Sequence, residues 1–207
     1  MIPAKKNRFL HWFFYRYINY IVKKNFHAVN FNAIEADPKR SVLMVANHFS
    51  WWDGFILYYI SYKLLNKRFH IMVLEETMRS HAPLKYMGAF SVAKNSRDIV
   101  ASLDYAAGLL NDPGNLVVIY PQGKLYSNFV DEVIFDKGAW HILNKAKAKT
   151  RLMFAATFIE NFEHKKPVAY VYMGESQAGI ENISQLTTAY QQHYAASKAR
   201  QQQIIIE

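Results

Sequence analysis

The segment SVLMVANHFSWWDGF, Ser41–Phe55, decides the fold class and contains the candidate site. Its first six residues, Ser41–Ala46, form a short and nearly uninterrupted apolar run, which is typical of a strand buried on both faces of a sheet. The run ends abruptly at Asn47 and His48. Asp53 begins a predicted helix that extends to about Leu65. The segment therefore predicts a buried strand, a short polar loop and a helix.

Strands and helices alternate along most of the remaining chain, which favours an α/β domain with a mainly parallel central sheet flanked by helices. Further strands are predicted at Phe69–Leu74, Ala89–Ala93, Leu116–Tyr120, Leu152–Ile159 and Val168–Met173. Further helices are predicted at Asn7–Lys24, after an N-cap at Ser96, at Gly138–Lys147 and at Ile183–Gln202. The last of these is rich in Gln and is expected on the surface. "NDPGN", Asn111–Asn115, is a strong turn signal between the Ser96 helix and the next strand.

The chain has 207 residues, no repeat and no long linker, and we expect a single domain. Residues 1–34 are expected to form a helical arm, 41–175 the catalytic core and 183–203 a C-terminal surface helix. The absence of cysteine excludes disulfides, thiolate nucleophiles and cysteine-based zinc sites.

The N-terminal arm is basic and aromatic. The formal net charge of the chain is +9, and the first acidic residue is Glu35. The helix predicted at Asn7–Lys24 is amphipathic, rich in aromatic residues and flanked by lysines, a composition typical of helices that lie in a membrane interface. Polar residues interrupt it too often for a membrane span, and it lacks the features of a signal peptide. The alternative is an ordinary helix packed on the domain. We expect a peripheral protein at the cytoplasmic face of the membrane.

His48 and Asp53 are candidates for acid–base chemistry. An imidazole can accept a proton from a hydroxyl, and a carboxylate on its other nitrogen would orient it and stabilise the imidazolium. The pair can meet only if His48 lies on the loop before the helix. The alternative is a structural histidine and a helix-capping aspartate. No Gly-x-Ser-x-Gly elbow and no metal-ligand spacing is present, so the proton would come from a substrate hydroxyl or from water.

Four sequence blocks, in order, resemble the glycerolipid (1-acylglycerol-3-phosphate) acyltransferase superfamily. "NHFSWWD" is similar to the N-H-x4-D block of that family, and "GAFSVAKNSRD", Gly88–Asp98, is similar to the second block. "VVIYPQGKLYS", Val117–Ser127, resembles a strand followed by Phe-Pro-Glu-Gly-Thr-Arg-Ser. "FDKGAWHIL", Phe135–Leu143, matches the segment that follows, and "LMFAATFIE", Leu152–Glu160, resembles the fourth block without its usual proline. The resemblance covers about Ser41–Glu175.

The resemblance implies a membrane-associated O-acyltransferase of lipid metabolism. His48 would deprotonate a lipid hydroxyl, and Asp53 would orient His48. An acyl thioester of CoA or acyl carrier protein would be the co-substrate. Neither a resident cofactor nor a metal is expected. Both donors are anionic, which suits a basic protein. The resemblance assigns substrate-binding roles to Asn47, Gly88, Lys94, Arg97, Pro121, Gln122, Gly123 and Lys124. Expected partners are the donor, the lipid acceptor and an anionic membrane surface, without nucleic acid.

The third block departs from the family pattern in ways that bear on the acceptor. Gln122 replaces Glu, and Lys124 and Leu125 stand where Thr and Arg are usual. The lost Arg would have been a bidentate phosphate ligand. These differences therefore favour a lipid acceptor other than lysophosphatidic acid. Two alternatives stay open: a non-catalytic lipid- or acyl-carrier-binding protein on the same fold, and a nucleic-acid binder suggested only by charge.

Overall fold

The structure is a computed structural model that describes residues 1–5, 7–92, 96–146, 150–176 and 179–206. The side chains of residue 8 and of residues 96–98 are also outside the description. Three parts of the sequence predictions therefore lie outside it: Ala93, Lys94 and Lys147.

The described strands form one seven-stranded sheet in the order β1-β7-β6-β2-β5-β3-β4. All neighbours pair in parallel except β6 and β7, which are antiparallel. This confirms the predicted α/β fold with a mainly parallel sheet. The strands are β1 (Ala28–Phe31), β2 (Ser41–Ala46), β3 (Arg68–Leu74), β4 (Ala89–Val92), β5 (Asn115–Ile119), β6 (Thr150–Glu160) and β7 (Val168–Glu175).

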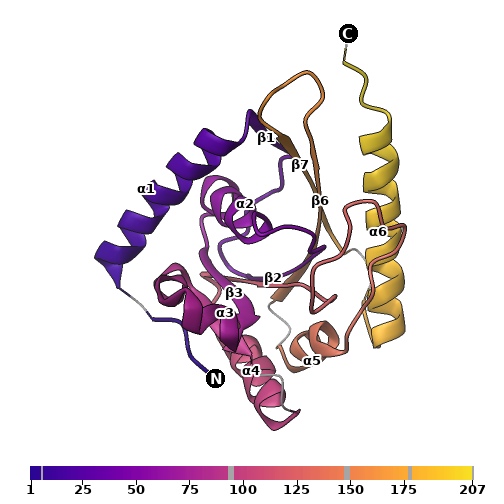
Figure 1. The fold of residues 1–207 in the computed structure, drawn as a ribbon. Coiled ribbons are helices and arrows are strands. Elements are labelled where there is room, and N and C mark those ends of the chain that lie inside the picture. Colours follow the sequence, from indigo (N-terminus) through magenta and orange to yellow (C-terminus); the bar gives the residue numbers. More distant parts are fainter. Residues whose placement is uncertain (6, 93–95, 147–149, 177–178, 207) are drawn as a thin grey trace.

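Helices cover both faces of the sheet (Figure 1). The elements are α1 (Arg8–Asn25), α2 (Asp53–Ile60), the π-helical turn η1 (Ser61–Leu65), α3 (Glu75–Ser80), the 3-10 helix η2 (Ala82–Met87), α4 (Ser96–Leu109), α5 (Gly138–Lys145) and α6 (Ile183–Gln202). One hydrophobic cluster joins α1, α2, η1, α3 and η2 to the sheet. The other joins α4, α5 and α6 to the opposite face.

The strand that the opening segment predicts is the centre of the fold. All six residues of β2 are buried, and β2 lies between β5 and β6. A strand covered on both faces by helices favours apolar side chains, which explains the nearly uninterrupted pattern. The one polar residue, Ser41, donates its hydroxyl to the Leu110 carbonyl. The carboxyl end of β2 leads into the loop that carries His48.

Four local features differ from the sequence predictions or were absent from them. β1, α3 and η2 are short elements without a clear periodic pattern, and none was predicted. The helix that starts at Asp53 stops being α-helical at Ile60, passes through η1 and ends at Asn66, whose φ is +48°. Ser96 begins α4 instead of preceding it. The prediction of a polar surface helix is incomplete for α6, because Tyr190 and Tyr194 are buried against the sheet.

Helix α1 has two distinct faces. Ile18 and Val22 are buried in the core, while large aromatic side chains on the other face are exposed. Asn7 caps the helix by accepting a hydrogen bond from the Leu10 N–H. Within the described ranges, no helix combines the length and apolar character that a bilayer crossing requires.

Candidate active site

The site lies where β2 and β5 end side by side. These neighbouring parallel strands pair with Val45 opposite Ile119, so the loops that follow them emerge at the same edge of the sheet. Functional groups gather at such carboxyl ends in open α/β sheets. The loop after β2 carries His48, and the loop after β5 carries the Tyr120–Tyr126 segment of the third sequence block.

His48 and Asp53 form a hydrogen-bonded pair. The imidazole Nδ1 lies 2.8 Å from Oδ2 of Asp53, and the carboxylate is buried. The same Oδ2 accepts hydrogen bonds from the backbone N–H groups of Phe49 and Ser50, at 2.8 and 2.9 Å. These bonds fold the loop around the carboxylate, which is how residues five positions apart meet. Because Nδ1 bonds to the carboxylate, Nε2 is the nitrogen left for a proton acceptor role.

The loop after β5 holds the backbone of His48 on two sides. The Gln122 side chain accepts a hydrogen bond from the His48 N–H at 2.6 Å, and the His48 carbonyl accepts one from the Tyr126 N–H at 3.0 Å. Gln122 is buried. The third block therefore fixes the position of His48 through main-chain bonds.

Tyr120 stacks on the imidazole of His48. The ring centroids are 4.2 Å apart and the planes differ by 7°. Burial, and secondarily the Asp53 charge, raise the pKa of Tyr120 well above its ordinary value, so its hydroxyl stays protonated. Tyr120 was not among the predicted site residues, because it lies at the end of a predicted strand. The available signal was a Tyr at the place where the third block has Phe.

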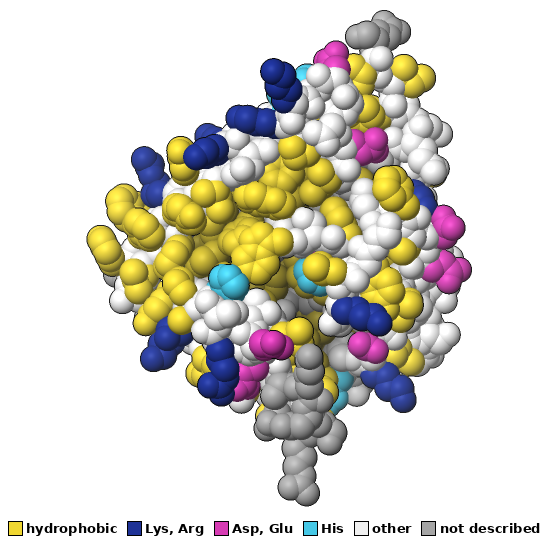
Figure 2. All heavy atoms as spheres, viewed as in Figure 1, with side chains coloured by type: hydrophobic (Ala, Val, Ile, Leu, Met, Phe, Trp, Pro, Cys, Tyr) yellow, Lys and Arg dark blue, Asp and Glu magenta, His cyan; other side chains and the backbone are white. Residues whose placement is uncertain are grey.

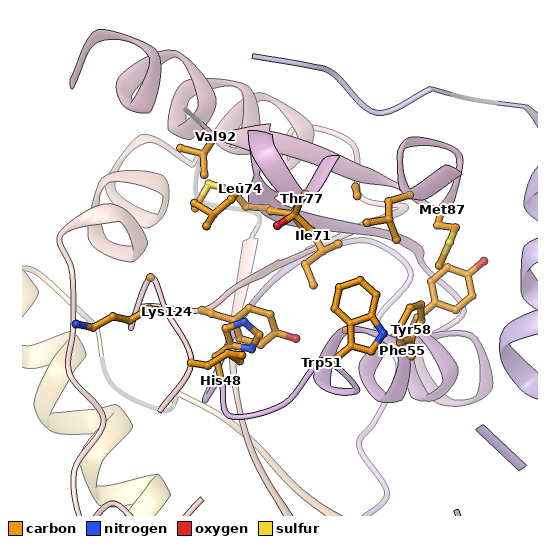
Figure 3. Close-up of a pocket in the computed structure, with 18 of the residues that line it drawn as sticks. His48, Trp51, Phe55, Tyr58, Ile71, Leu74, Thr77, Met87, Val92 and Lys124 are labelled. Atoms are coloured by element: carbon orange, nitrogen blue, oxygen red, sulfur yellow. The ribbon is translucent and has the colours of Figure 1, made fainter. Parts of the chain in front are cut away.

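An apolar cavity of about 460 Å³ opens beside His48. Figure 3 shows His48 and Lys124 toward one end of it and Tyr58 and Met87 toward the other, with Trp51 between them. Strands β3 and β4 and helices α2, α3 and η2 supply most of the wall. The lining residues include Phe55, Phe69, Ile71, Met72, Val73, Leu74, Leu84, Ala89 and Val92. The cavity is suited to an apolar ligand that ends near the imidazole.

Four of the residues predicted to bind substrate divide into two groups. Gly123 and Lys124 line the cavity, as does Leu125. Asn47 and Gln122 instead make hydrogen bonds within the protein: the Asn47 amide donates to the Thr157 carbonyl and accepts from the Thr157 N–H, at 2.9 and 2.8 Å. Asn47 thus joins the site loop to β6.

The other predicted residues have backbone roles or are not described. Gly88 has φ +96°, and a Cβ there would lie 1.9 Å from the Phe69 carbonyl oxygen, so only glycine fits this approach to β3. The Pro121 carbonyl accepts a hydrogen bond from the Asp136 N–H at 2.8 Å. Lys94 and the side chain of Arg97 lie outside what the structure describes.

Hydrophobic side chains gather on the face that contains α1 and α2, with Lys and Arg around the rim (Figure 2). The exposed members on α1 are Phe9, Trp12, Phe13, Tyr17 and Tyr20. Trp51, which lines the cavity, is also half exposed. We call these five α1 residues the aromatic face.

Comparisons with known proteins agree with this geometry. The Acyltransferase family model matches residues 19–169. Among solved structures, the 1-acyl-sn-glycerophosphate (LPA) acyltransferase PlsC from Thermotoga maritima is similar with a TM-score of 0.64 and 14% identity, over 95% of this chain and 83% of that chain. A search of curated proteins finds no match. The likeness to PlsC is one of fold, whereas the family match spans well over half of the sequence. The chain therefore belongs to the acyltransferase family, as the ordered blocks of its sequence predicted.

Proposed function

We propose that this protein is a membrane-associated O-acyltransferase that moves a fatty acyl group from a thioester donor to a lipid hydroxyl. One observation carries the proposal: the His48–Asp53 pair lies at one end of an apolar cavity in a chain of the acyltransferase family. The cavity supplies an environment for an acyl chain, and the pair supplies a base for a hydroxyl. The family match also favours an enzyme over a non-catalytic binding protein.

In the proposed reaction His48 acts first as base and then as acid. The acceptor hydroxyl gives its proton to Nε2 while its oxygen attacks the thioester carbonyl carbon. The C–S bond then breaks, the carbonyl re-forms, and the departing thiolate takes the proton from the imidazolium. Asp53 stabilises that imidazolium through Nδ1 and keeps the ring in the required tautomer. The products are an acylated lipid and the free thiol of CoA or acyl carrier protein.

The acceptor is proposed to be a lipid whose headgroup carries less charge than a phosphate monoester. Leu125 lies on the cavity wall where the family pattern has an Arg, and Lys124 beside it offers a single cation. An ammonium is a point charge and does not replace the bidentate geometry of a guanidinium. Aminolipids, glycolipids and pigment-like lipids fit this description better than lysophosphatidic acid does.

Membrane association is proposed to occur through α1 at the cytoplasmic face, where CoA and carrier-protein thioesters are made. The aromatic face is exposed, although burial of such large rings is normally favourable. Lys23 and Lys24 in the last turn are placed to contact anionic headgroups. Trp51 at the cavity is itself half exposed, so a docked protein would receive its lipid acceptor directly from the bilayer.

The test is acyl transfer by the purified protein. Vesicles made from a total bacterial lipid extract are incubated with isotopically labelled palmitoyl-CoA or palmitoyl acyl carrier protein, and lipid products are found by mass spectrometry. A parallel reaction uses vesicles that contain lysophosphatidic acid as the sole acceptor. We expect a labelled lipid from the extract and little product from lysophosphatidic acid. Absence of any acylated lipid with both donors would contradict the proposal.

A further inference from the structure

Two buried oxygens on residues that contact the His48 ring have no hydrogen-bond partner among the described residues. They are the Tyr120 hydroxyl and Oδ1 of Asp53. A buried polar atom without a partner costs about 1–3 kcal/mol, so native proteins rarely leave one unexplained. Here one atom is a donor and the other an acceptor, and both belong to residues that contact the same imidazole.

The geometry places the two residues on adjacent sides of His48. Asp53 meets the ring edge at Nδ1, 2.8 Å away, and Tyr120 covers a ring face at a centroid distance of 4.2 Å. The negative charge of Asp53 is one of the influences that raise the pKa of the Tyr120 phenol, after burial. The phenol therefore lies within electrostatic reach of the carboxylate and remains a proton donor.

Neighbouring groups already have other partners. Oδ2 of Asp53 accepts from three donors, whereas Oδ1 accepts from none among the described residues. Tyr190, which approaches from α6, donates its hydroxyl to the Ala155 carbonyl at 2.9 Å. The Tyr120 hydroxyl is therefore the donor available to Oδ1, the second carboxylate oxygen of Asp53.

We propose that Tyr120 is a positioning residue that donates its hydroxyl hydrogen bond to Oδ1 of Asp53 through one buried water, and so regulates the base. The inference rests on the proposed function of His48 and extends it. A hydrogen bond to Oδ1 disperses the carboxylate charge and limits how strongly Asp53 holds a proton on the imidazole. The base then releases its proton more readily to the departing thiolate.

Four titratable groups on the elements packed around His48 affect its protonation. Asp53 approaches His48 from α2, Tyr120 from the end of β5, and Lys124 from the loop that follows β5, while Tyr190 lies near Asp53 from α6. Only the Tyr120 hydroxyl is removed by Tyr120→Phe, because phenylalanine retains the stacked ring. Loss of the hydroxyl leaves Asp53 more basic, so His48 should become protonated at a higher pH.

The test is an NMR titration of the His48 imidazole in the full-length protein, a readout that needs no acyl transfer. We expect Tyr120→Phe to move the His48 titration to higher pH. Tyr194→Phe is the matched control, because that buried hydroxyl donates to the Val130 carbonyl and lies outside the cavity lining. In an Asp53→Asn background, Tyr120→Phe should have no effect, because the hydroxyl acts through the carboxylate.

An unchanged titration in Tyr120→Phe, or an equal shift in the Asp53→Asn background, would overturn the proposal. A crystal structure of the unaltered protein gives a second measurement that does not depend on how the variants fold. It should show one water within about 2.6–3.0 Å of both the Tyr120 hydroxyl and Oδ1. A hydroxyl turned into the cavity would overturn the inference. These readouts can fail while acyl transfer is observed, and can succeed while it is not.

Discussion

The Gln122 side chain accepts a hydrogen bond from the backbone N–H of His48, with 2.6 Å between Oε1 and the nitrogen. The two residues come from loops that follow neighbouring strands, β2 and β5. Where the family pattern has a glutamate, this chain keeps the accepting oxygen but not the charge. The exchange leaves the support of His48 intact and makes its surroundings less negative.

Removing the Gln122 side-chain oxygen should impair His48 as a base while the imidazole itself stays in place. Gln122→Ala leaves the His48 N–H without its partner, and we expect unfolding free energy to fall by about 1–3 kcal/mol and kcat by about tenfold. Gln122→Glu keeps an accepting oxygen and should retain more activity than the alanine variant. Urea unfolding and steady-state kinetics check both. A Gln122→Ala enzyme with unaltered kcat would show that this bond does not position His48.

The far end of the cavity should determine acyl chain length. Met87 lines it opposite His48 (Figure 3). Met87→Ala extends the space, so preference among acyl donors should move toward longer chains. Met78→Ala is the matched control, because Met78 is buried but does not line the cavity. Each substitution should cost about 2–5 kcal/mol of stability. Competition between donors of different length measures the preference, and equal shifts in both variants would contradict the assignment.

The aromatic face of α1 should be needed for membrane binding but not for folding. A triple variant with Trp12, Tyr17 and Tyr20 changed to Gln alters side chains that are all about half exposed or more. We expect at least a tenfold loss of binding to anionic vesicles in flotation, because the apolar contact with the interface is lost. The control is Phe129→Gln with Ile134→Gln, which changes exposed apolar residues outside α1. Equal binding by the triple variant and wild type would refute the role of α1.

Acid should weaken one ion pair between β6 and β7 in a predictable direction. The hydrogen bond from Arg151, a buried guanidinium, holds the pKa of Glu175 below its ordinary value of 4.5. A depressed pKa adds stability above pH 4.5 that is lost as pH falls through the lower folded-state value. Glu175→Gln should therefore lower unfolding free energy by about 1–3 kcal/mol at pH 7 and by much less near pH 3. Denaturant unfolding of both proteins at both pH values checks this. A difference in unfolding free energy between wild type and variant that grows in acid would contradict the prediction.

Local patterns in the sequence were sufficient for the main elements. The nearly uninterrupted apolar run of β2 and the polar, Gln-rich stretch of α6 gave bounds that the structure reproduces, because these elements are long or fully buried. β1 was not predicted, since four residues at the sheet edge carry too little pattern. η1 was missed for a related reason: a π-turn continues the helical periodicity and differs only in its hydrogen bonds.

The sequence predicted the site residues that lie close together in the chain. His48 and Asp53 were candidates by residue type and were assigned through the family block, and the structure brings the two side chains together. The support of His48 by Gln122 and the stacking of Tyr120 depend on the pairing of β2 with β5, which residue spacing does not reveal. Gly88 was assigned to substrate binding because it belongs to a family block, whereas its positive φ and its contact with β3 give it a backbone role.

The central claim is that His48 is the base for acyl transfer, and one comparison of two variants tests it most directly. His48→Ala removes the proposed base, and His141→Ala removes the histidine of another His–Asp pair, 2.7 Å from Asp104 and outside the cavity lining. Both enzymes are assayed for acyl transfer into lipid-extract vesicles, with binding of acyl donor measured in parallel. We expect His48→Ala to lose at least a hundredfold in kcat while still binding donor, and His141→Ala to retain wild-type kcat. Wild-type turnover in His48→Ala would contradict the account.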